Sequence, residues 1–260
     1  MNGPQVVGLI ERRVLVDHLV DPALARSLVP DGFELNLVHG QAVVGLCLIR
    51  LTHLRPAPLP ASIGVTIEAV AHRISVLGPL DGGRAPGVYV PRRDTSSFAA
   101  VVLGGRVFPG VHGPATIRSQ GGDRRAEVQA SCGDGAAIDV AVVGRPTEGS
   151  LGGRHQAMFD LHRSELVAWS PRRRGSGLDL AVMTCHRFDA TPVEVLRAES
   201  SWLSACPGFG PDVLGSPSAL IMEHIPVTWA GGERAATRST SCAVGAPMVQ
   251  SEHGSVTVDA

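Results

Sequence analysis

The sequence predicts a mainly β (α+β) fold with two or three short helices. Most segments of the 260-residue chain are short and either apolar or alternating, and 31 glycines and 19 prolines separate them. Many short segments bounded by turn residues are typical of antiparallel strands rather than of a helical bundle. The clearest hairpin covers residues 125–144, where alternate apolar residues from Ala126 to Cys132 line one side, and Asp134 and Gly135 supply the turn.

The first part of the chain alternates strands with short helices. Residues 21–30 are predicted to form a helix, because Asp21 is a suitable N-cap and Pro22 fits the first helical position. Asp94 offers a second N-cap, to a helix over residues 95–106 that ends at its paired glycines. The strands predicted in this part of the chain cover residues 13–20, 41–51, 64–77 and 87–91.

Two later segments stay open between helix and strand. Residues 155–169 fit either structure. Residues 190–206 contain a capping-box sequence at Thr191 and Glu194, which favours a helix. They also alternate in side-chain character like a strand. The three tryptophans are in this half, where they either line a cavity or fill the core, and we favour the core. They are Trp169, Trp202 and Trp229.

Composition predicts a single cytoplasmic domain over residues 1–260. A net charge of −1 gives no electrostatic basis for binding nucleic acid or an anionic membrane. No run of about 18 apolar residues predicts a membrane span. Five scattered cysteines without a CxxC pair indicate a reducing compartment and no metal site. We expect no cofactor, and assembly into a homo-oligomer stays open.

Three fragments of the first half carry a family resemblance. Residues 104–115, GGRVFPGVHGPA, match a loop of the form G-R-E-x-x-x-x-P-K-K at Gly105 and Arg106. Residues 20–35 are similar to a segment of the form T-D-x-x-A-L-x-x-x-x-P-x-x-L-E, and residues 66–70, TIEAV, to an acidic strand. In this order, over about residues 12–118, the fragments resemble the acetoacetate decarboxylase-like superfamily, in a divergent, uncharacterised bacterial branch.

The resemblance implies an antiparallel, closed, cone-like β-barrel around an enclosed pocket, with a few flanking helices. In the decarboxylases a lysine amine forms an imine with a β-keto acid. Gly113 stands at that lysine's position, and the whole chain contains no lysine. Val107 replaces the loop glutamate, and a second acidic residue expected within residues 42–49 is absent. Schiff-base catalysis through a lysine is therefore excluded.

Three residues at the matching positions are candidate catalytic groups. Glu68 would be a general base if it faces the pocket, or an ordinary solvated carboxylate if it faces outward. Arg106 would clamp a substrate carboxylate, or would tie the loop to the barrel. His112 would donate to a developing enolate or carry a proton, or would be a surface histidine of the loop.

Two further residues are candidate substrate contacts. Arg12 and Arg13 fall near the position of an N-terminal active-site arginine of the family, and we assign the role to Arg13. His72 is four residues from Glu68 on the same predicted strand, so the two share a face while Arg73 points to the other.

These residues predict an imine-independent enzyme of the lyase, isomerase or cyclase type, acting on a small to medium apolar keto or carboxylate compound. The alternative is a non-catalytic small-molecule-binding barrel, and a third reading is a structural or protein-interaction module. No nucleophile-elbow, zincin or P-loop motif points to another chemistry. The enzyme prediction requires Glu68, Arg106 and His112 to converge on one enclosed cavity.

Overall fold

The computed structural model describes residues 5–103, 110–144, 153–173, 177–185 and 187–231, and these contain one 13-stranded sheet. The strands are β1 (Gln5–Val20), β2 (Glu34–Leu35), β3 (Leu37–Val38), β4 (Gln41–Pro56), β5 (Val65–Leu80), β6 (Gly83–Thr95), β7 (Gly113–Gly122), β8 (Arg125–Cys132), β9 (Ala137–Val143), β10 (Val167–Pro171), β11 (Leu178–Cys185), β12 (Thr191–Ser200) and β13 (Ser218–Gly231). The helices are α1 (Pro22–Arg26), α2 (Phe98–Leu103), α3 (Gly153–Ser164), α4 (Ser201–Ala205) and α5 (Pro211–Leu214), with a 3-10 turn at Ala61–Ile63.

The strand pairings form two closed circuits that share five strands. The first, which we call the cavity circuit, runs β13, β1, β4, β5, β6, β10, β11 and back to β13. The second, the packed circuit, leaves β6 through β7, β8, β9 and β12 and also returns to β13. All these pairs are antiparallel except β6 with β7 and β6 with β10. The predicted antiparallel β fold is confirmed, whereas the cone-like shape stays a prediction.

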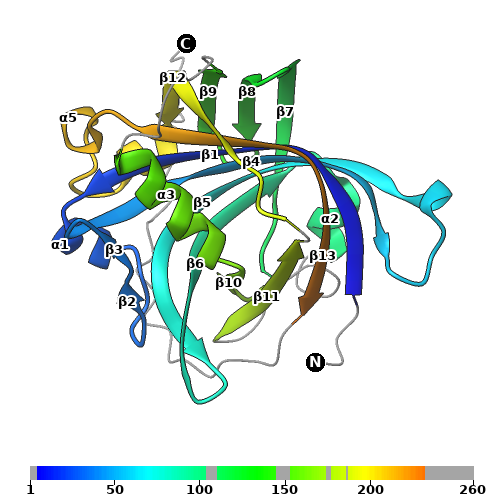
Figure 1. The fold of residues 1–260 in the computed structure, drawn as a ribbon, viewed down its shortest axis with the longest axis horizontal. Helices are drawn as coiled ribbons and strands as arrows, with labels where there is room; N and C mark the ends of the chain where they lie inside the picture. The colour runs from blue at the N-terminus through cyan, green and yellow to red at the C-terminus, as the bar shows by residue number, and fades with distance from the viewer. Residues whose placement is uncertain (1–4, 104–109, 145–152, 174–176, 186, 232–260) are drawn as a thin grey trace, which may run out of the picture.

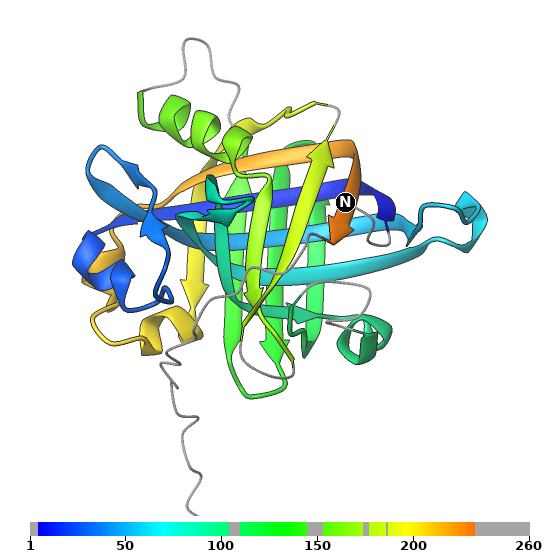
Figure 2. The same ribbon diagram turned by 90° about the horizontal axis from the view of Figure 1, so that it is seen from below.

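The five shared strands form a wall with two faces, which we call the shared wall. Its long strands β1, β4, β5 and β13 extend across the molecule, and α3 lies beside them (Figure 1). Strands β7, β8 and β9 run across the shared wall (Figure 2). Apolar side chains of both layers fill the space between them, including Val14, Leu46, Val70, Val128 and Val140. One face of the wall therefore packs against a second layer of sheet.

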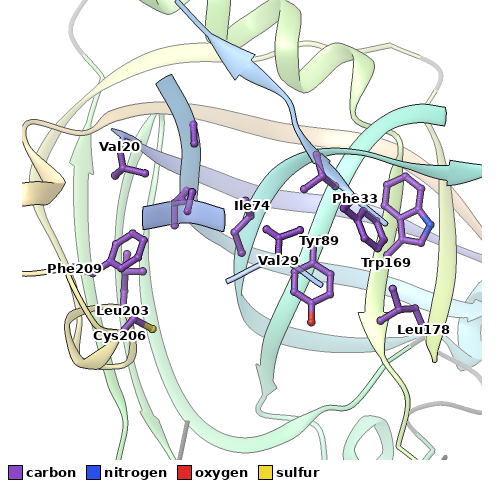
Figure 3. Close-up of a cluster of buried hydrophobic side chains, with 14 of the residues drawn as sticks. Val20, Val29, Phe33, Ile74, Tyr89, Trp169, Leu178, Leu203, Cys206 and Phe209 are labelled. Atoms are coloured by element: carbon purple, nitrogen blue, oxygen red, sulfur yellow. The ribbon is translucent and has the colours of Figure 1, made fainter. Parts of the chain in front are cut away.

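An aromatic cluster fills the end of the fold near α1. Trp169 of β10 is fully buried, with the edge of its ring against Phe33 at a centroid distance of 5.3 Å (Figure 3). Two glycines make room for it: a Cβ at Gly78 would lie 2.7 Å from the Trp169 ring, and one at Gly87 would lie 2.6 Å from it. Truncation of such a buried aromatic residue to alanine typically costs about 3–5 kcal/mol of stability.

The elements predicted for the first part of the chain are present, with one correction. The four predicted strands are parts of β1, β4, β5 and β6, and Asp21 caps α1 by accepting a hydrogen bond from the Ala23 amide at 2.7 Å. Asp94 is not a helix cap: it belongs to β6 and pairs with Arg92. The Ser97 hydroxyl instead accepts a hydrogen bond from the Ala100 amide at the start of α2. The glycines predicted to end this helix lie outside the described residues.

The structure decides between helix and strand for the two segments of the later chain that the sequence left open. The predicted hairpin is β8 and β9, and its alternating apolar side is buried. Residues 155–169 are helix α3 followed by strand β10, and residues 191–205 are strand β12 followed by α4. The capping-box spelling at Thr191 lies within a strand, and the helix cap is Ser200, which accepts a hydrogen bond from Leu203. No helix in the described ranges is long and apolar enough to cross a membrane.

Candidate functional site

A cavity of about 170 Å³ lies on the face of the shared wall that looks into the cavity circuit. Each of the seven strands of that circuit contributes lining residues, and His112, Glu165 and Leu166 complete the lining. The volume is similar to the roughly 150 Å³ of a protein cavity that holds benzene. Small side chains help to leave this space empty. They are Ala69, Ala71, Ala168, Ala181 and Ala230. The cavity therefore has room for a ligand of several heavy atoms.

The lining is mainly apolar and includes several charged or ionisable groups. The large apolar contacts come from residues such as Ile49, Leu51, Ile67, Val90, Met183 and Trp229. The charged and ionisable contacts come from Arg13, Arg73, Arg93, His112 and Glu165. An apolar pocket with a few convergent polar groups is typical of a small-molecule site, and guanidinium groups match a carboxylate.

Arg13 faces the cavity, as the sequence predicted for a substrate contact. Its Nε donates to the Cys47 sulfur at 3.3 Å, and no carboxylate of the described residues forms an ion pair with it. Arg12, the adjacent residue, lies on the other face of the shared wall beside Glu68. A β-bulge around Glu11 decides which of the two arginines faces the cavity, because the pairing of β1 with β4 shifts by one residue between Ile10 and Arg12.

Arg93 enters the cavity because β6 is irregular. Val88 and Val90 line the cavity, so simple alternation would place Arg92 there as the next residue. The pairing of β5 with β6 shifts between His72 and Ile74, and Arg93 takes the position instead. Burial lowers the pKa of Arg93. The sequence analysis missed this residue because alternation alone does not reveal a bulge.

A buried cluster of four ionisable side chains borders the cavity beside α3. The Arg73 guanidinium contacts Asp17 and also Glu165, at 3.3 Å. His162 places Nε2 2.7 Å from Asp17 and Nδ1 3.1 Å from Glu165. Ser75 donates a further hydrogen bond to Glu165. All four ionisable side chains are at most 4% exposed, so each charge depends on its partners.

Electrostatics within this cluster favours the charged forms. Burial disfavours the charge on Arg73, but Asp17 and Glu165 outweigh it and raise its pKa. Burial and Arg73 act to lower the pKa of His162, and the two carboxylates more than offset them, so the pKa is raised. The pKa of Asp17 is lowered, because Arg73 and His162 outweigh its burial. Glu165 is thus held in ion pairs at the cavity wall.

Glu68 is not where the enzyme prediction required it. It lies on the opposite face of the shared wall, in a void of about 10 Å³ with Arg12 and Ser119. Its carboxylate pairs with Arg50 at 3.0 Å and accepts a hydrogen bond from Ser119. The expected convergence of Glu68 with His112 is therefore wrong, since strand alternation places Glu68 opposite to the cavity-lining Ala69. Arg106 lies outside the described residues.

His72 also faces away from the cavity. His72 and Glu68 lie on the same face of β5, and Arg73 lies on the opposite face, which lines the cavity, as strand alternation predicted. Its Nε2 lies 2.7 Å from the Ser200 hydroxyl, and its ring packs 4.4 Å from that of Trp202. Burial, with a smaller contribution from the Arg92 charge, lowers the pKa of His72 to about 3. His72 therefore does not line this cavity, because the shared wall separates the two, and its contact with a ligand stays a prediction.

Residue 113, which the resemblance aligns with the lysine of the decarboxylases, is closed in by a neighbouring carboxylate. His112 lines the cavity, and Gly113 follows it at the start of β7. A Cβ on Gly113 would overlap the Asp94 carboxylate, which is held in place by Arg92 at 2.6 Å. Glycine at residue 113 therefore fits the local packing, and a longer side chain would have to displace an ion pair.

A comparison with protein families identifies this chain. A family model whose description is "uncharacterized conserved protein" matches residues 10–163, which is more than half of the chain. The chain belongs to the DUF2071 family. The DUF2071 match covers β1 to α3, and therefore includes Arg13, Arg93 and His112. None of the curated proteins matches this DUF2071 chain.

Solved structures share the fold of this DUF2071 protein over nearly its full length. The acetoacetate decarboxylase of Legionella pneumophila is 14% identical, with a TM-score of 0.56 over 90% of this chain and 88% of that one. An acetoacetate decarboxylase-like enzyme from Sphingomonas wittichii is 14% identical, with a TM-score of 0.54 over 92% and 95%. The enduracididine biosynthesis enzyme MppR, complexed with pyruvate, is 15% identical, with a TM-score of 0.53 over 90% and 91%. The acetoacetate decarboxylase-like fold predicted from the sequence is confirmed.

Proposed function

We propose that the cavity binds a small, mainly apolar carboxylic or keto acid and that the protein catalyses an imine-independent reaction of the lyase, isomerase or cyclase type on it. The observation that carries the proposal is Arg13, a guanidinium that borders an apolar cavity and pairs with no described carboxylate. A ligand carboxylate would supply that partner, with Arg93 on another strand of the same cavity. The closed strand circuit would then act as the cone-like barrel that encloses the ligand.

The reaction would begin with proton transfer at the carbon next to a carbonyl group. The His112 imidazole would accept the proton, and the electron pair of the broken C–H bond would move to the carbonyl oxygen as an enolate. The guanidinium groups that line the cavity would stabilise this negative charge, because electrostatic interactions are stronger in an apolar site. Return of the proton from His112 would complete the exchange, and Arg106 stays a proposed partner in this step.

The ligand class is consistent with names among the structural neighbours. Two of them are decarboxylase or decarboxylase-like enzymes, and the MppR structure holds pyruvate, a small keto acid. A lysine imine is not available to this chain, because it has no lysine. The enolate would therefore form by direct proton abstraction.

The test is hydrogen–deuterium exchange on a panel of 2-keto and 3-keto acids in D₂O, followed by proton NMR. The proposal expects one or more acids to lose the α-proton signal faster than with buffer alone. His112→Gln should abolish this acceleration while acid binding persists, as measured by saturation-transfer NMR. Arg13→Gln should weaken acid binding by about tenfold or more, the loss expected for a charge-assisted hydrogen bond of about 1.5–3 kcal/mol. Accelerated exchange that is unchanged in His112→Gln would overturn the proposed role of this residue.

One observation favours the non-catalytic alternative. Glu165, a described carboxylate at the cavity wall, is held by Arg73, His162 and Ser75, and Glu68 lies on the other face. Glu165, the carboxylate that lines the described cavity, is therefore already paired within the protein. Acids that bind at the cavity but undergo no exchange would identify a binding protein instead of an enzyme.

A further inference from the structure

Cys47 contributes a sulfur atom to the cavity wall. It lies on β4 between Leu46 and Leu48, whose side chains face the packed layer, while Cys47 and Ile49 face the cavity. The side chain is a free thiol of intermediate exposure. Cys47 pairs directly across the sheet with Ala71, and Ala71 pairs with Arg93 on the next strand. Since Ala71 ends at Cβ, open space separates the sulfur from Arg93.

Guanidinium groups from three strands line the cavity together with this sulfur. Arg13 donates its Nε to the sulfur at 3.3 Å. Arg73 and Arg93 line the same cavity, where Arg73 also pairs with Glu165 at 3.3 Å. The Arg73 side chain is only 4% exposed. Its Nε is buried and has no hydrogen-bond partner in the part of the chain that the structure describes. Buried donors are normally satisfied, so an acceptor on a molecule in the cavity would complete the contacts of this Nε.

We propose that Cys47 is a nucleophile that forms a covalent adduct with small carboxylic acids carrying an electrophilic carbon, such as α,β-unsaturated acids. This inference rests on the proposed function in one respect, since both require an acid to enter the cavity. The guanidinium groups would hold the carboxylate, and the apolar wall would hold the remaining carbon atoms. The reactive carbon of a short acid would then lie near the sulfur.

The addition step balances without any further reactant. The thiol transfers its proton to the His112 imidazole or to water, and the thiolate forms a C–S bond to the β-carbon while the C=C electron pair moves onto the α-carbon and carboxylate. A proton then returns to the α-carbon, from the His112 imidazolium or from water. The product is the saturated thioether, which contains all atoms of the thiol and the acid.

The first experiment compares an anionic with a neutral alkylating agent on the unmodified full chain. Iodoacetate and iodoacetamide both react by attack of the thiolate on CH₂, with formation of a C–S bond and departure of iodide. The ratio of their rate constants at one cysteine therefore isolates recognition of the carboxylate. Peptide mass spectrometry gives this ratio at Cys47 and at Cys185, a thiol of similar exposure on β11 that does not line the cavity.

The proposal expects the iodoacetate-to-iodoacetamide ratio at Cys47 to exceed that at Cys185 by about tenfold or more, the effect of about 1.4 kcal/mol of selective binding. Arg13→Gln should bring the ratio at Cys47 close to that at Cys185. Arg12→Gln is the matched control, since Arg12 faces the packed layer, and it should leave the ratio high. Incubation with acrylate should then add one acrylate to the intact chain, and Cys47→Ser should prevent it.

A ratio at Cys47 equal to that at Cys185 in the unmodified chain would overturn the inference, and so would acrylate addition at another cysteine in preference to Cys47. Saturation-transfer NMR with butyrate, an acid without an electrophilic carbon, separates this failure from failure of the proposed function. Butyrate binding without selective alkylation would refute only the nucleophile. Absence of both would refute acid binding in the cavity as well.

Discussion

The two faces of the shared wall carry similar charged residues in opposite settings. On the packed face, Glu68 and Arg50 pair at 3.0 Å and Ser119 completes the carboxylate's contacts. On the cavity face, Arg13 borders empty space and contacts a sulfur atom. A charge buried against a filled layer needs a partner within the protein, whereas one beside a cavity can obtain it from a ligand. The comparison shows that the partners of a charged residue depend on the face that it occupies, not on its residue type.

The largest expected effect comes from breaking the buried cluster on the cavity face. Arg73→Met would leave the Asp17 and Glu165 carboxylates buried with only His162 as a cation. We expect the free energy of unfolding in urea to fall by about 3–5 kcal/mol, as for removal of one partner of a buried ion pair. Arg187→Met, which removes an exposed pair with Asp189, should change it by less than about 1 kcal/mol. Similar losses in the two variants would show that the cluster does not hold the cavity wall.

The next effect tests whether residue 113 accepts a lysine. Gly113→Lys would push a Cβ into the Asp94 carboxylate, so we expect a loss of about 1–3 kcal/mol of stability, as for overpacking. Borohydride trapping with acetoacetate should yield no adduct at residue 113. Gly122→Lys is the matched control, since a Cβ there meets nothing within 4 Å. A stable Gly113→Lys protein that forms a trapped imine would contradict this account of the loop.

A smaller effect separates the two faces directly. Glu68→Gln weakens the contacts with Arg50 and Ser119, and we expect a loss of about 1–2 kcal/mol of stability, as for hydrogen bonds to charged groups. Acid binding and exchange should be unchanged, because the shared wall separates Glu68 from the cavity. Urea unfolding and the NMR exchange assay measure the two quantities on one sample. Loss of exchange in a stable Glu68→Gln protein would restore Glu68 as the catalytic base.

The smallest expected effect is a pH dependence of stability from His162. Its pKa is raised in the folded protein, so its contribution is fully present below the ordinary histidine pKa of about 6.5. The contribution is lost as the pH rises through the raised value, because Asp17 and Glu165 then keep Arg73 as their only charged partner in the cluster. Unfolding free energies measured across this range should decline, and His162→Gln should flatten the decline. A decline of equal size in the variant would assign it to another group.

The sequence determined the elements and the limits on chemistry. Alternation and turn residues predicted the β8–β9 hairpin, and the Asp21 cap placed α1. The absence of lysine excluded the Schiff base by composition alone. These inferences succeed because they depend on neighbours within a few residues or on composition, which sequence alone contains. The match of three short fragments also predicted the fold that the structural comparison confirms.

Only the tertiary structure decided which residues share a site. A bulge near Glu11 changes which residues of β1 face the cavity, so that Arg13 faces it and Arg12 faces away. A register shift between β5 and β6 near Arg73 has the same effect on β6, where Arg93 faces the cavity and Arg92 faces away. A one-residue shift exchanges the faces of a strand, and no local pattern of the sequence marks it. The same holds for the Asp17–His162 contact, whose partners are 145 residues apart. The site depends on strand register and circuit closure, which are properties of the folded sheet.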